Sequence, residues 1–221
     1  MDGRIASVAY LFPDDGYMCS FNLFLEKGYR RAGDIFYCNI CEACCACKPI
    51  RLDPACFVIS RSQKRTMNIN RDIRVVVNEV SPLSDEKVAL YAKYVGSKHA
   101  DPLKKSGDPG VALESMRLGY PGTVEMEYYL QDRLIAVGIV DVAADALSSN
   151  YFYYDTGYLS RRLGVFSIIN EILLCRELGK KYYYLGFYVE ETSKMRYKKD
   201  FRPNQIYEGG EWKDFLQGKA G

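Results

Sequence analysis

Five cysteines lie within a short stretch of the chain, from Cys38 to Cys47. Cys38, Cys41 and Cys44 are each separated by two residues, Cys45 follows directly, and Cys47 completes the run. Thiolates at this spacing bind tetrahedral zinc, and the run is close to, without matching, the Cys-x2-Cys-x2-Cys-x3-Cys-Pro pattern of iron–sulfur sites. We therefore expect Cys38, Cys41, Cys44 and Cys47 to be metal ligands, of zinc or of an iron–sulfur cluster, rather than idle thiols.

Two groups of basic residues have the composition of nucleic-acid contacts. The first group comprises Arg30, Arg31, Arg61, Lys64 and Arg65. The second group comprises Lys194, Arg196, Lys198, Lys199 and Arg202, with Tyr197 and Phe201 between them. Cations neutralise phosphates and flat rings stack on bases, but similar runs also occur as solvated surfaces. Composition alone leaves both interpretations open.

The overall composition is that of an ordinary globular protein of 221 residues, with 48% hydrophobic and 26% charged residues. This excludes a disordered or fibrous chain. No apolar stretch approaches the roughly 20 residues that span a bilayer, and the N-terminus lacks the pattern of a signal peptide. We expect a cytoplasmic protein with no membrane partner. Its 8 cysteines should then be reduced, which favours a metal site over disulfides.

The first half of the chain predicts a small module followed by isolated elements. Alternating apolar residues predict strands over 49–59, and the basic segment 60–70 is expected to be a helix or a loop. A short strand is expected over 73–77, and Ser84 begins a helix with two carboxylates in its first turn. Three prolines and four glycines over 99–122 predict a connection with little regular structure.

The second half predicts a clear order of strands and one long helix. Residues 123–130 and 133–142 form a hairpin, 149–155 a third strand, 163–178 a helix ended by Gly179, and 182–187 a fourth strand. This order predicts the α+β class. We expect an N-terminal module at 1–75 that carries the cysteines, and a second domain at 76–221.

The start of the long helix resembles a cofactor loop. Arg161-Arg162-Leu163-Gly164-Val165-Phe166 is similar to the Arg/Gln-x-x-Gly-x-Gly/Ala loop of the acetyltransferase-like (GNAT) superfamily, whose backbone N–H groups hold a diphosphate. Phe166 stands where Gly or Ala would let the backbone approach that diphosphate. The resemblance implies a GNAT-like core and, through Phe166, argues against coenzyme A.

Longer motifs resemble the arginyl- and leucyl-tRNA–protein transferases. The matching segments are 28–33, 60–65, 91–94 with Lys98 and His99, 151–155, 164–178, 184–188 and 194–203. The resemblance therefore extends over separate motifs from about Gly28 to Trp212. It implies a GNAT-like catalytic core in which aminoacyl-tRNA replaces the acyl-CoA donor.

The implied reaction is attack of a protein's N-terminal amine on the ester that joins an amino acid to tRNA. Such an amine has a pKa of roughly 7.7–8.0, and a positioned base adds about 10²–10⁴-fold, so no cofactor is required for transfer. The resemblance implies transfer of an amino acid from tRNA to an N-terminal Asp or Glu, which marks the acceptor for degradation (N-end rule). The short chain favours leucine from leucyl-tRNA, because short bacterial members of the family mostly carry leucine. Arginyl-tRNA is the alternative donor, and a non-catalytic RNA-binding or redox-sensing module is a further alternative.

The candidate bases are carboxylates on the expected strands: Asp155, Glu127 and Asp141. Each could equally be a solvated acid at a strand end. Asp155 is preferred because it precedes the loop where a GNAT-like core binds its acyl group. Tyr154 and Tyr158 flank it, and either could hydrogen-bond the ester or stack on the terminal adenine.

The candidate substrate-binding residues divide between donor and acceptor. Lys194, Tyr197, Lys198 and Arg202 are expected to contact the tRNA. Arg30, Arg31, Arg61 and Arg65 could do the same, and they also compete for the carboxylate of the acceptor.

The family resemblance extends to the cysteines, with one departure. Cys41, Cys44 and Cys47, followed by Pro49 and Arg51, match the bacterial Cys-x2-Cys-x2-Cys-x-Pro-x-Arg element. The family usually has a further cysteine just before an early Tyr-Leu pair. Here Val8 precedes Ala9-Tyr10-Leu11, and Cys19 is the only early cysteine. We expect Cys38 to take the place of that ligand.

Overall fold

The computed structural model describes residues 7–13, 20–41, 44–98 and 107–215. The chain forms two compact units that are interleaved in sequence. The first unit contains residues 1–58, 143–148 and 173–221, and the second contains 59–142 and 149–172. These units are defined by compactness, and the division into a module at 1–75 and a domain at 76–221 stays a prediction.

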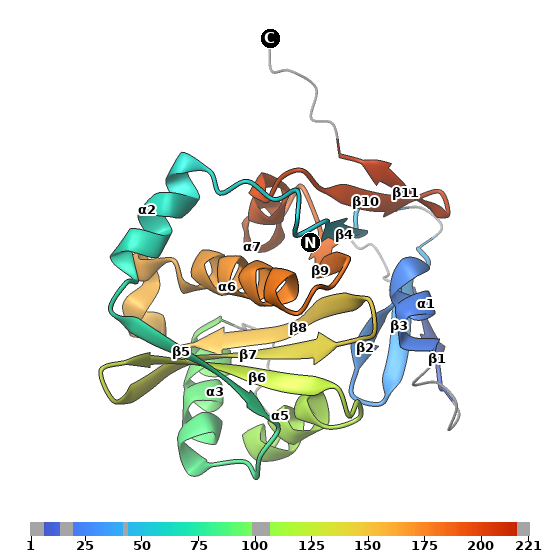
Figure 1. Ribbon diagram of the computed structural model, residues 1–221. Helices are drawn as coiled ribbons and strands as arrows, with labels where there is room; N and C mark the ends of the chain where they lie inside the picture. The colour runs from blue at the N-terminus through green and yellow to red at the C-terminus, as the bar shows by residue number, and fades with distance from the viewer. Residues whose placement is uncertain (1–6, 14–19, 42–43, 99–106, 216–221) are drawn as a thin grey trace. The chain divides into compact units, whose positions relative to one another are not determined.

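The first unit contains a small antiparallel sheet in the order β1-β3-β2. Its strands are β1 (Val8–Leu11), β2 (Arg30–Ala32) and β3 (Ile35–Asn39). Helix α1 (Phe21–Glu26) packs against β3, because the rings of Phe21 and Phe24 lie 5.1 and 4.6 Å from the ring of Phe36 (Figure 1).

A second group of strands in the first unit has the order β11-β10-β4-β9-β8. The bounds are β4 (Lys48–Leu52), β8 (Ala146–Tyr154), β9 (Tyr182–Tyr188), β10 (Gln205–Glu208) and β11 (Glu211–Asp214), and β8 contributes only its first residues. There β8 runs parallel to β9, with Ala146 opposite Tyr182. Two short helices follow β9, α7 (Ser193–Arg196) and η3 (Tyr197–Asp200).

The strands predicted over 49–59 are confirmed only as far as Leu52. Beyond it the Asp53 carboxylate accepts a hydrogen bond from the N–H of Ala55 at 2.8 Å. This local bond replaces a strand ladder with a turn, because an Asx turn satisfies the backbone donor from within the segment.

The second unit contains strands in the order β8-β7-β6-β5, with the later residues of β8. The bounds are β5 (Ile73–Glu79), β6 (Thr123–Leu130) and β7 (Arg133–Val142). The hairpin predicted at residues 131–132 is confirmed, with Gln131 in the left-handed region at φ 55°. Leu90 of α3 (Asp85–Lys98) packs with Val137 and Tyr153 on one face, and Phe166 of α6 contacts Tyr128 on the other (Figure 1).

Of the two alternatives expected for residues 60–70, a helix or a loop, the structure has the helix, and the long helix expected over 163–178 is also present. The basic segment forms α2 (Arg61–Ile69), whose N-cap Ser60 and Gln63 make a reciprocal capping box. Helix α6 (Leu163–Glu177) follows the short helix η2 (Thr156–Arg161) and continues into the first unit. It ends before Gly179, whose φ of +65° is the conformation that terminates helices.

The expectation of little regular structure over 99–122 is wrong for α5 (Pro109–Arg117), which is a helix. Asp108 caps it by accepting from the N–H groups of Gly110 and Val111 at 2.7 and 3.0 Å. Pro109 at the first helical position needs no donor there. Buried Leu113 then anchors the helix, so tertiary packing outweighs the glycine and proline content.

The α+β class predicted from the sequence is confirmed. The parallel strands β8 and β9 are joined through α6, which is the arrangement expected of the acetyltransferase-like core. Within the described residues, no helix is long and apolar enough to cross a membrane.

Candidate active site and substrate-binding residues

Asp155 directly follows strand β8, caps η2 and is buried in the second unit. Its carboxylate accepts hydrogen bonds from Lys93 Nζ at 2.6 Å, Arg133 at 2.7 Å and the N–H of Gly157 at 2.9 Å. Burial alone would raise the pKa of Asp155, but the hydrogen bonds from Lys93 and Gly157 and the nearby positive charges outweigh it and lower the pKa. Such a carboxylate fixes the entry to η2, and it is a weak proton acceptor at neutral pH.

Glu127 lies on β6 within a buried charge network. Its carboxylate binds Lys87 Nζ at 2.6 Å and accepts from Asn78 and from the hydroxyl of Tyr129 at 3.0 and 2.7 Å. Burial and the bond to Glu127 raise the pKa of Tyr129 to about 12, so this tyrosine keeps its proton and donates it. Three donors therefore hold the Glu127 carboxylate in one orientation.

The same network contains two cations that the sequence analysis does not select. Lys87 Nζ also binds Glu125 at 2.8 Å, and Arg117 Nε binds the other oxygen of Glu125 at 2.8 Å. Burial would lower the pKa values of Lys87 and Arg117, but their carboxylate partners raise both. Sequence spacing could not identify this pairing because Lys87, Arg117 and Glu125 lie on different elements.

Asp141 is the third candidate base, and it lies fully buried at the end of β7. Its carboxylate accepts from Thr123 Oγ1 at 2.9 Å and from Asn150 Nδ2 at 3.3 Å. Asp155, Glu127 and Asp141 thus each have a different set of partners. Their assignment as bases stays a prediction.

The two tyrosines near Asp155 lie in aromatic surroundings. The ring of Tyr154 lies 5.0 Å from that of Tyr94 and 5.5 Å from that of Phe152. The guanidinium of Arg133 lies 5.9 Å from the ring of Tyr158. Both tyrosines are half-buried, so each keeps some accessible ring surface for the predicted contacts with substrate.

The structure separates the four competing arginines. Arg30 and Arg31 of β2 are buried, whereas Arg61 and Arg65 of α2 are exposed. Arg30 donates to Ser148 Oγ at 3.0 Å, and Arg31 donates to the carbonyl of Gly33. The buried pair suits a small carboxylate group, and the exposed pair suits a large polyanion.

Arg30 is brought together with Lys198 over Gly186. Lys198 Nζ donates to the carbonyl of Leu185 at 2.7 Å. A Cβ at Gly186 would lie 3.0 Å from Lys198 Nζ and 3.5 Å from an Arg30 nitrogen, so both cations approach one point. Gly186 has a φ of +94°, which L side chains rarely adopt. Glycine therefore permits both the backbone conformation and the approach of the two cations.

The other residues predicted to contact tRNA follow Gly186 along the chain. Lys194 of α7 and Arg202 are exposed, and Arg202 Nε donates to the carbonyl of Lys199 at 3.2 Å. The ring of Tyr197 lies 6.4 Å from that of Phe201, which is buried. Lys194 and Arg202 thus remain accessible, while Tyr197 is tied to the core by its ring contact.

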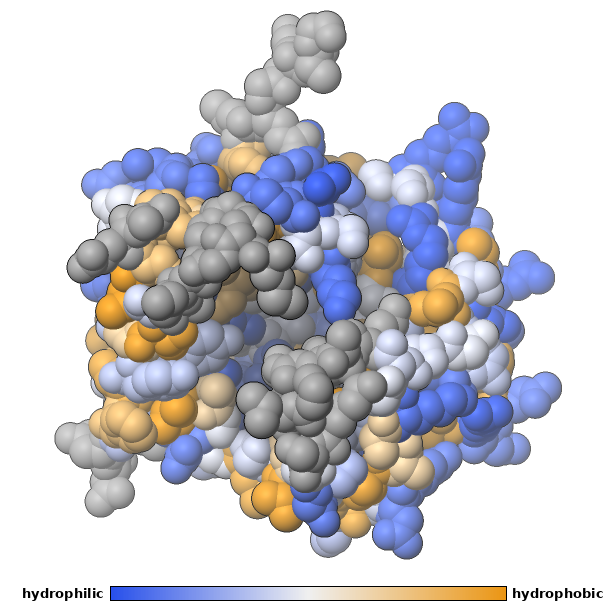
Figure 2. All heavy atoms as spheres, turned by 180° about the vertical axis from the view of Figure 1, so that it is seen from behind, coloured by the Kyte–Doolittle hydropathy of each residue, from blue (hydrophilic) through white to orange (hydrophobic). Residues whose placement is uncertain are grey.

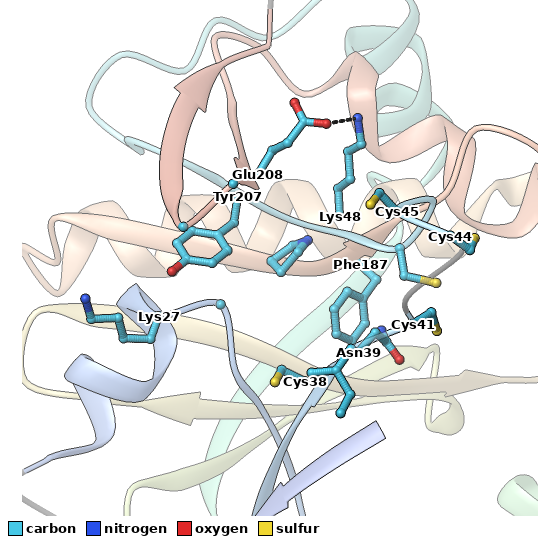
Figure 3. A pocket seen from close by; sticks show the side chains of 16 residues that line it. Lys27, Cys38, Asn39, Cys41, Cys44, Cys45, Lys48, Phe187, Tyr207 and Glu208 are labelled. Atoms are coloured by element: carbon cyan, nitrogen blue, oxygen red, sulfur yellow. Dashed lines mark ion pairs between the residues drawn. The ribbon is translucent and has the colours of Figure 1, made fainter. Parts of the chain in front are cut away.

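The five cysteines of the run from Cys38 to Cys47 line one cavity of about 270 Å³ in the first unit. Figure 3 shows Cys41, Cys44 and Cys45 on one side of this cavity and Cys38 on the other side of Phe187. Cys38 hydrogen-bonds the hydroxyl of Tyr29, and this bond, more than burial, raises the pKa of Tyr29.

The thiols of the described cysteines are not arranged as a metal site. Among the described residues, no group of three or more Cys, His, Asp or Glu side chains is arranged to hold a metal ion. Partial burial raises the pKa of the Cys47 thiol, and the charges of Cys41, Cys44 and Glu191 raise it further. The ligand assignment of Cys38, Cys41, Cys44 and Cys47 stays a prediction.

The start of α6 lacks an open diphosphate loop. The carbonyl of Arg162 accepts from the N–H groups of Val165 and Phe166 at 2.9 and 3.1 Å. Phe166 is buried, and its ring packs 5.9 Å from that of Tyr128. These two N–H groups are bonded within the turn, and the core side chain of Phe166 fills the position where the loop pattern has Gly or Ala.

A buried polar chain in the second unit was not predicted. The hydroxyl of Tyr128 donates to Ser167 Oγ at 3.2 Å, and Ser167 donates to Glu171 at 2.7 Å. All three are buried, and Glu171 adds to the burial that raises the pKa of Tyr128. The spacing of Ser167 and Glu171 by one helical turn is the only signal in the sequence.

The comparisons with known proteins agree over most of the chain. Residues 9–65 match the family described as "Arginine-tRNA-protein transferase, N terminus", and residues 86–208 match its C terminus. "Aspartate/glutamate leucyltransferase" of Aeromonas hydrophila subsp. hydrophila is 34% identical over 202 residues, which are 88% of this chain and 81% of that protein. The protein of the same name from Alkalilimnicola ehrlichii is 32% identical over 216 residues, covering 96% and 89%.

One solved structure that matches part of the chain is the PaiA N-acetyltransferase from Thermoplasma acidophilum in complex with coenzyme A. Its identity is 10%, and the TM-score is 0.36 over 48% of this chain and 74% of that one.

These findings first define the class: the protein is an aminoacyltransferase, which acts with aminoacyl-tRNA and a protein substrate. More particularly, the chain belongs to the arginine-tRNA-protein transferase family.

Proposed function

We propose that this protein transfers leucine from leucyl-tRNA to the N-terminal Asp or Glu of acceptor proteins, in the cytoplasm, as a mark for degradation. The observation that carries the proposal is 34% identity to a relative named aspartate/glutamate leucyltransferase, over 81% of that relative. The bonded N–H groups at the start of α6 support it, because they argue against coenzyme A as the donor.

The transfer needs little beyond positioning. The lone pair of the acceptor's α-amine attacks the ester carbonyl, a peptide bond forms, and the ester C–O bond breaks. The tRNA 3′ hydroxyl leaves with a proton that the amine releases. Orientation of amine and ester can supply about 7–11 kcal/mol of the barrier. A buried carboxylate that accepts several hydrogen bonds, as Glu127 does, is suited to fixing the side chains around it.

The acceptor's acidic side chain is proposed to bind Arg30 and Lys198. These cations approach one point beside Gly186, and a carboxylate there can receive hydrogen bonds from both. Arg30 is fixed by Ser148, so it is preorganised for such a contact. An acceptor with a neutral first residue would lack this charge-assisted contact with Arg30 and Lys198, which disfavours its binding.

Arginine is the second candidate donor, because the matching family description names arginine. A transfer assay separates the two. The purified protein is incubated with tRNA charged with labelled leucine or arginine, and with peptides that begin with Asp, Glu, Arg or Ala. We expect label from leucyl-tRNA on the Asp and Glu peptides only. Label from arginyl-tRNA on the same peptides would replace leucine as donor, and no transfer at all would refute the proposal.

A further inference from the structure

Helix α2 carries its cations on one face, and these charges do not stabilise the helix. Arg61, Lys64 and Arg65 are exposed and spaced by one helical turn, while Gln63 and Thr66 are buried on the opposite side. Figure 2 shows long hydrophilic side chains projecting at the upper right, the side on which α2 lies when Figure 1 is turned. Among the described residues, none of the three cations makes an ion pair.

The placement of these charges opposes the stability of α2. A helix N-terminus carries a partial positive charge, yet the first turn of α2 holds no acid and begins with Arg61. Like charges at positions i and i+4, as in Arg61 and Arg65, also repel each other. This pattern of charges weakens the helix that carries it. We therefore infer that its role is to bind an external anion.

The rest of the unit holds this helix rigidly. The capping box fixes its first turn, with Gln63 N–H donating to Ser60 Oγ at 3.3 Å and Ser60 N–H donating to Gln63 Oε1 at 2.8 Å. At the other end, Asn70 Nδ2 donates to the carbonyl of Arg161 at 2.8 Å. The backbone that carries the cations is therefore held in place before any ligand binds.

A fourth cation joins this face from the loop before α6. Arg162 donates to Ser62 Oγ at 3.0 Å and is exposed. Its neighbour Arg161 is neutralised instead, because it binds both oxygens of Asp72 at 2.7 and 2.9 Å. The face of α2 thus continues into the loop at the start of α6.

We propose that Arg61, Lys64, Arg65 and Arg162 form a binding surface for phosphates of the donor tRNA, and that Arg61 and Arg65 do not bind the acceptor's carboxylate. This inference rests on the proposed use of an aminoacyl-tRNA donor. Arg61 and Arg65 lie about 6 Å apart along the helix axis, so they address separate charges along a strand rather than one carboxylate. Full exposure suits a polyanion, because a small carboxylate bound there would stay hydrated.

The test uses binding of deacylated tRNA, so it does not depend on transfer or on the identity of the amino acid. The triple variant Arg61→Gln, Lys64→Gln, Arg65→Gln is compared with the wild type by fluorescence anisotropy between about 50 and 200 mM salt. We expect affinity for tRNA to fall at least about tenfold. The slope of log affinity against log salt should decrease by about 2 to 3, one for each lost phosphate contact.

The matched control is Lys180→Gln, Lys181→Gln, Lys213→Gln, which removes the same charge from the first unit. Its tRNA affinity and salt slope should stay close to the wild-type values. The unfolding temperature of the α2 variant should not fall, because the removed charges oppose the helix. An unchanged salt slope in the α2 variant would overturn the proposal.

The KM for a peptide that begins with Asp shows whether the cations of α2 bind the acceptor's carboxylate or the phosphates of tRNA. If the α2 variant raised that KM and left tRNA binding intact, these arginines would belong to the acceptor site and the proposal would be wrong. Failure of leucine transfer in the wild type would refute the proposed function but leave the tRNA-binding result readable.

Discussion

At the scale of single residues, the contacts of a carboxylate indicate its role better than its position on a strand does. Asp155 stands just before the loop into α6, which makes it the preferred base in the sequence. In the structure its oxygens are bound by Lys93, Arg133 and the N–H of Gly157, and its pKa is lowered. These contacts favour a positioning role, in which Asp155 caps η2 and holds β8 against α3.

The variant Asp155→Asn tests this role by its effect on stability. It keeps the shape but removes the charge that binds Lys93 and Arg133, both of which are about half exposed. We expect the free energy of unfolding to fall by about 1–3 kcal/mol, measured by urea denaturation. Asp132→Asn, at the exposed turn of the hairpin, is the control and should change it by less than about 0.5 kcal/mol.

The pH dependence of this difference follows from the lowered pKa. A carboxylate with a lowered pKa stabilises the fold above its unfolded pKa of about 3.9 and loses that effect as pH falls through the folded value. The difference between wild type and Asp155→Asn should therefore be full at pH 7 and shrink below about pH 4. A variant of unchanged stability with activity lost at every pH would instead identify Asp155 as the base.

At the scale of elements, buried charges join helices to the sheet of the second unit. Arg117 at the end of α5 binds Glu125 of β6, and Lys87 of α3 binds Glu125 and Glu127. The hydroxyl of Tyr153 lies buried without a hydrogen-bond partner among the described residues, and its raised pKa reflects burial and then Glu125. The two helices thus depend on polar contacts as well as on the apolar core around Leu90 and Leu113.

Arg117→Ala should show how strongly α5 depends on this network. The substitution leaves Glu125 buried with only Lys87 as its cation, so we expect a loss of about 3–5 kcal/mol in the free energy of unfolding. Glu114→Ala removes a half-exposed partner of the same arginine and should cost less than about 1 kcal/mol. Equal effects of the two variants would contradict the network's importance.

At the scale of the whole molecule, the two substrates require different kinds of positive charge. The net charge of the chain is only +2, yet α2 concentrates exposed cations, while buried Arg30 and half-buried Lys198 meet beside Gly186. Exposed cations suit a long polyanion whose binding depends on salt. Buried cations suit one carboxylate, whose binding should be much less sensitive to salt.

The cysteine prediction is also tested on the whole protein, by elemental analysis after anaerobic purification. The sequence predicts a bound metal that Cys38→Ser and Cys41→Ser each remove, because both thiolates are expected ligands. Removal of the metal by a chelator should lower the unfolding temperature of the wild type. Cys56→Ser, an exposed cysteine outside the run, is the control. Full metal content in Cys38→Ser would exclude Cys38 from the ligand set.

The sequence by itself determined the class of fold, the family, and the elements from β4 to β9 other than α5 and η2. Local signals were enough for these, because the turn at residues 131–132, the Ser84 cap and Gly179 act within a few residues of their own position. The motifs around Tyr151 and Lys194 likewise carry the family resemblance without reference to contacts. The helix α5 was missed because its glycine and proline content hid a cap at Asp108 and an anchor at Leu113.

Only the tertiary structure decided which charges are buried and what they bind. Residue type alone does not distinguish Arg30 from Arg61, but the fold buries Arg30 near Lys198 and leaves Arg61 exposed to solvent. Asp155 reads as a free acid at the end of a strand until Lys93 and Arg133 are placed beside it. The physical reason is that desolvation and charge pairing depend on groups distant in sequence, which no local pattern encodes.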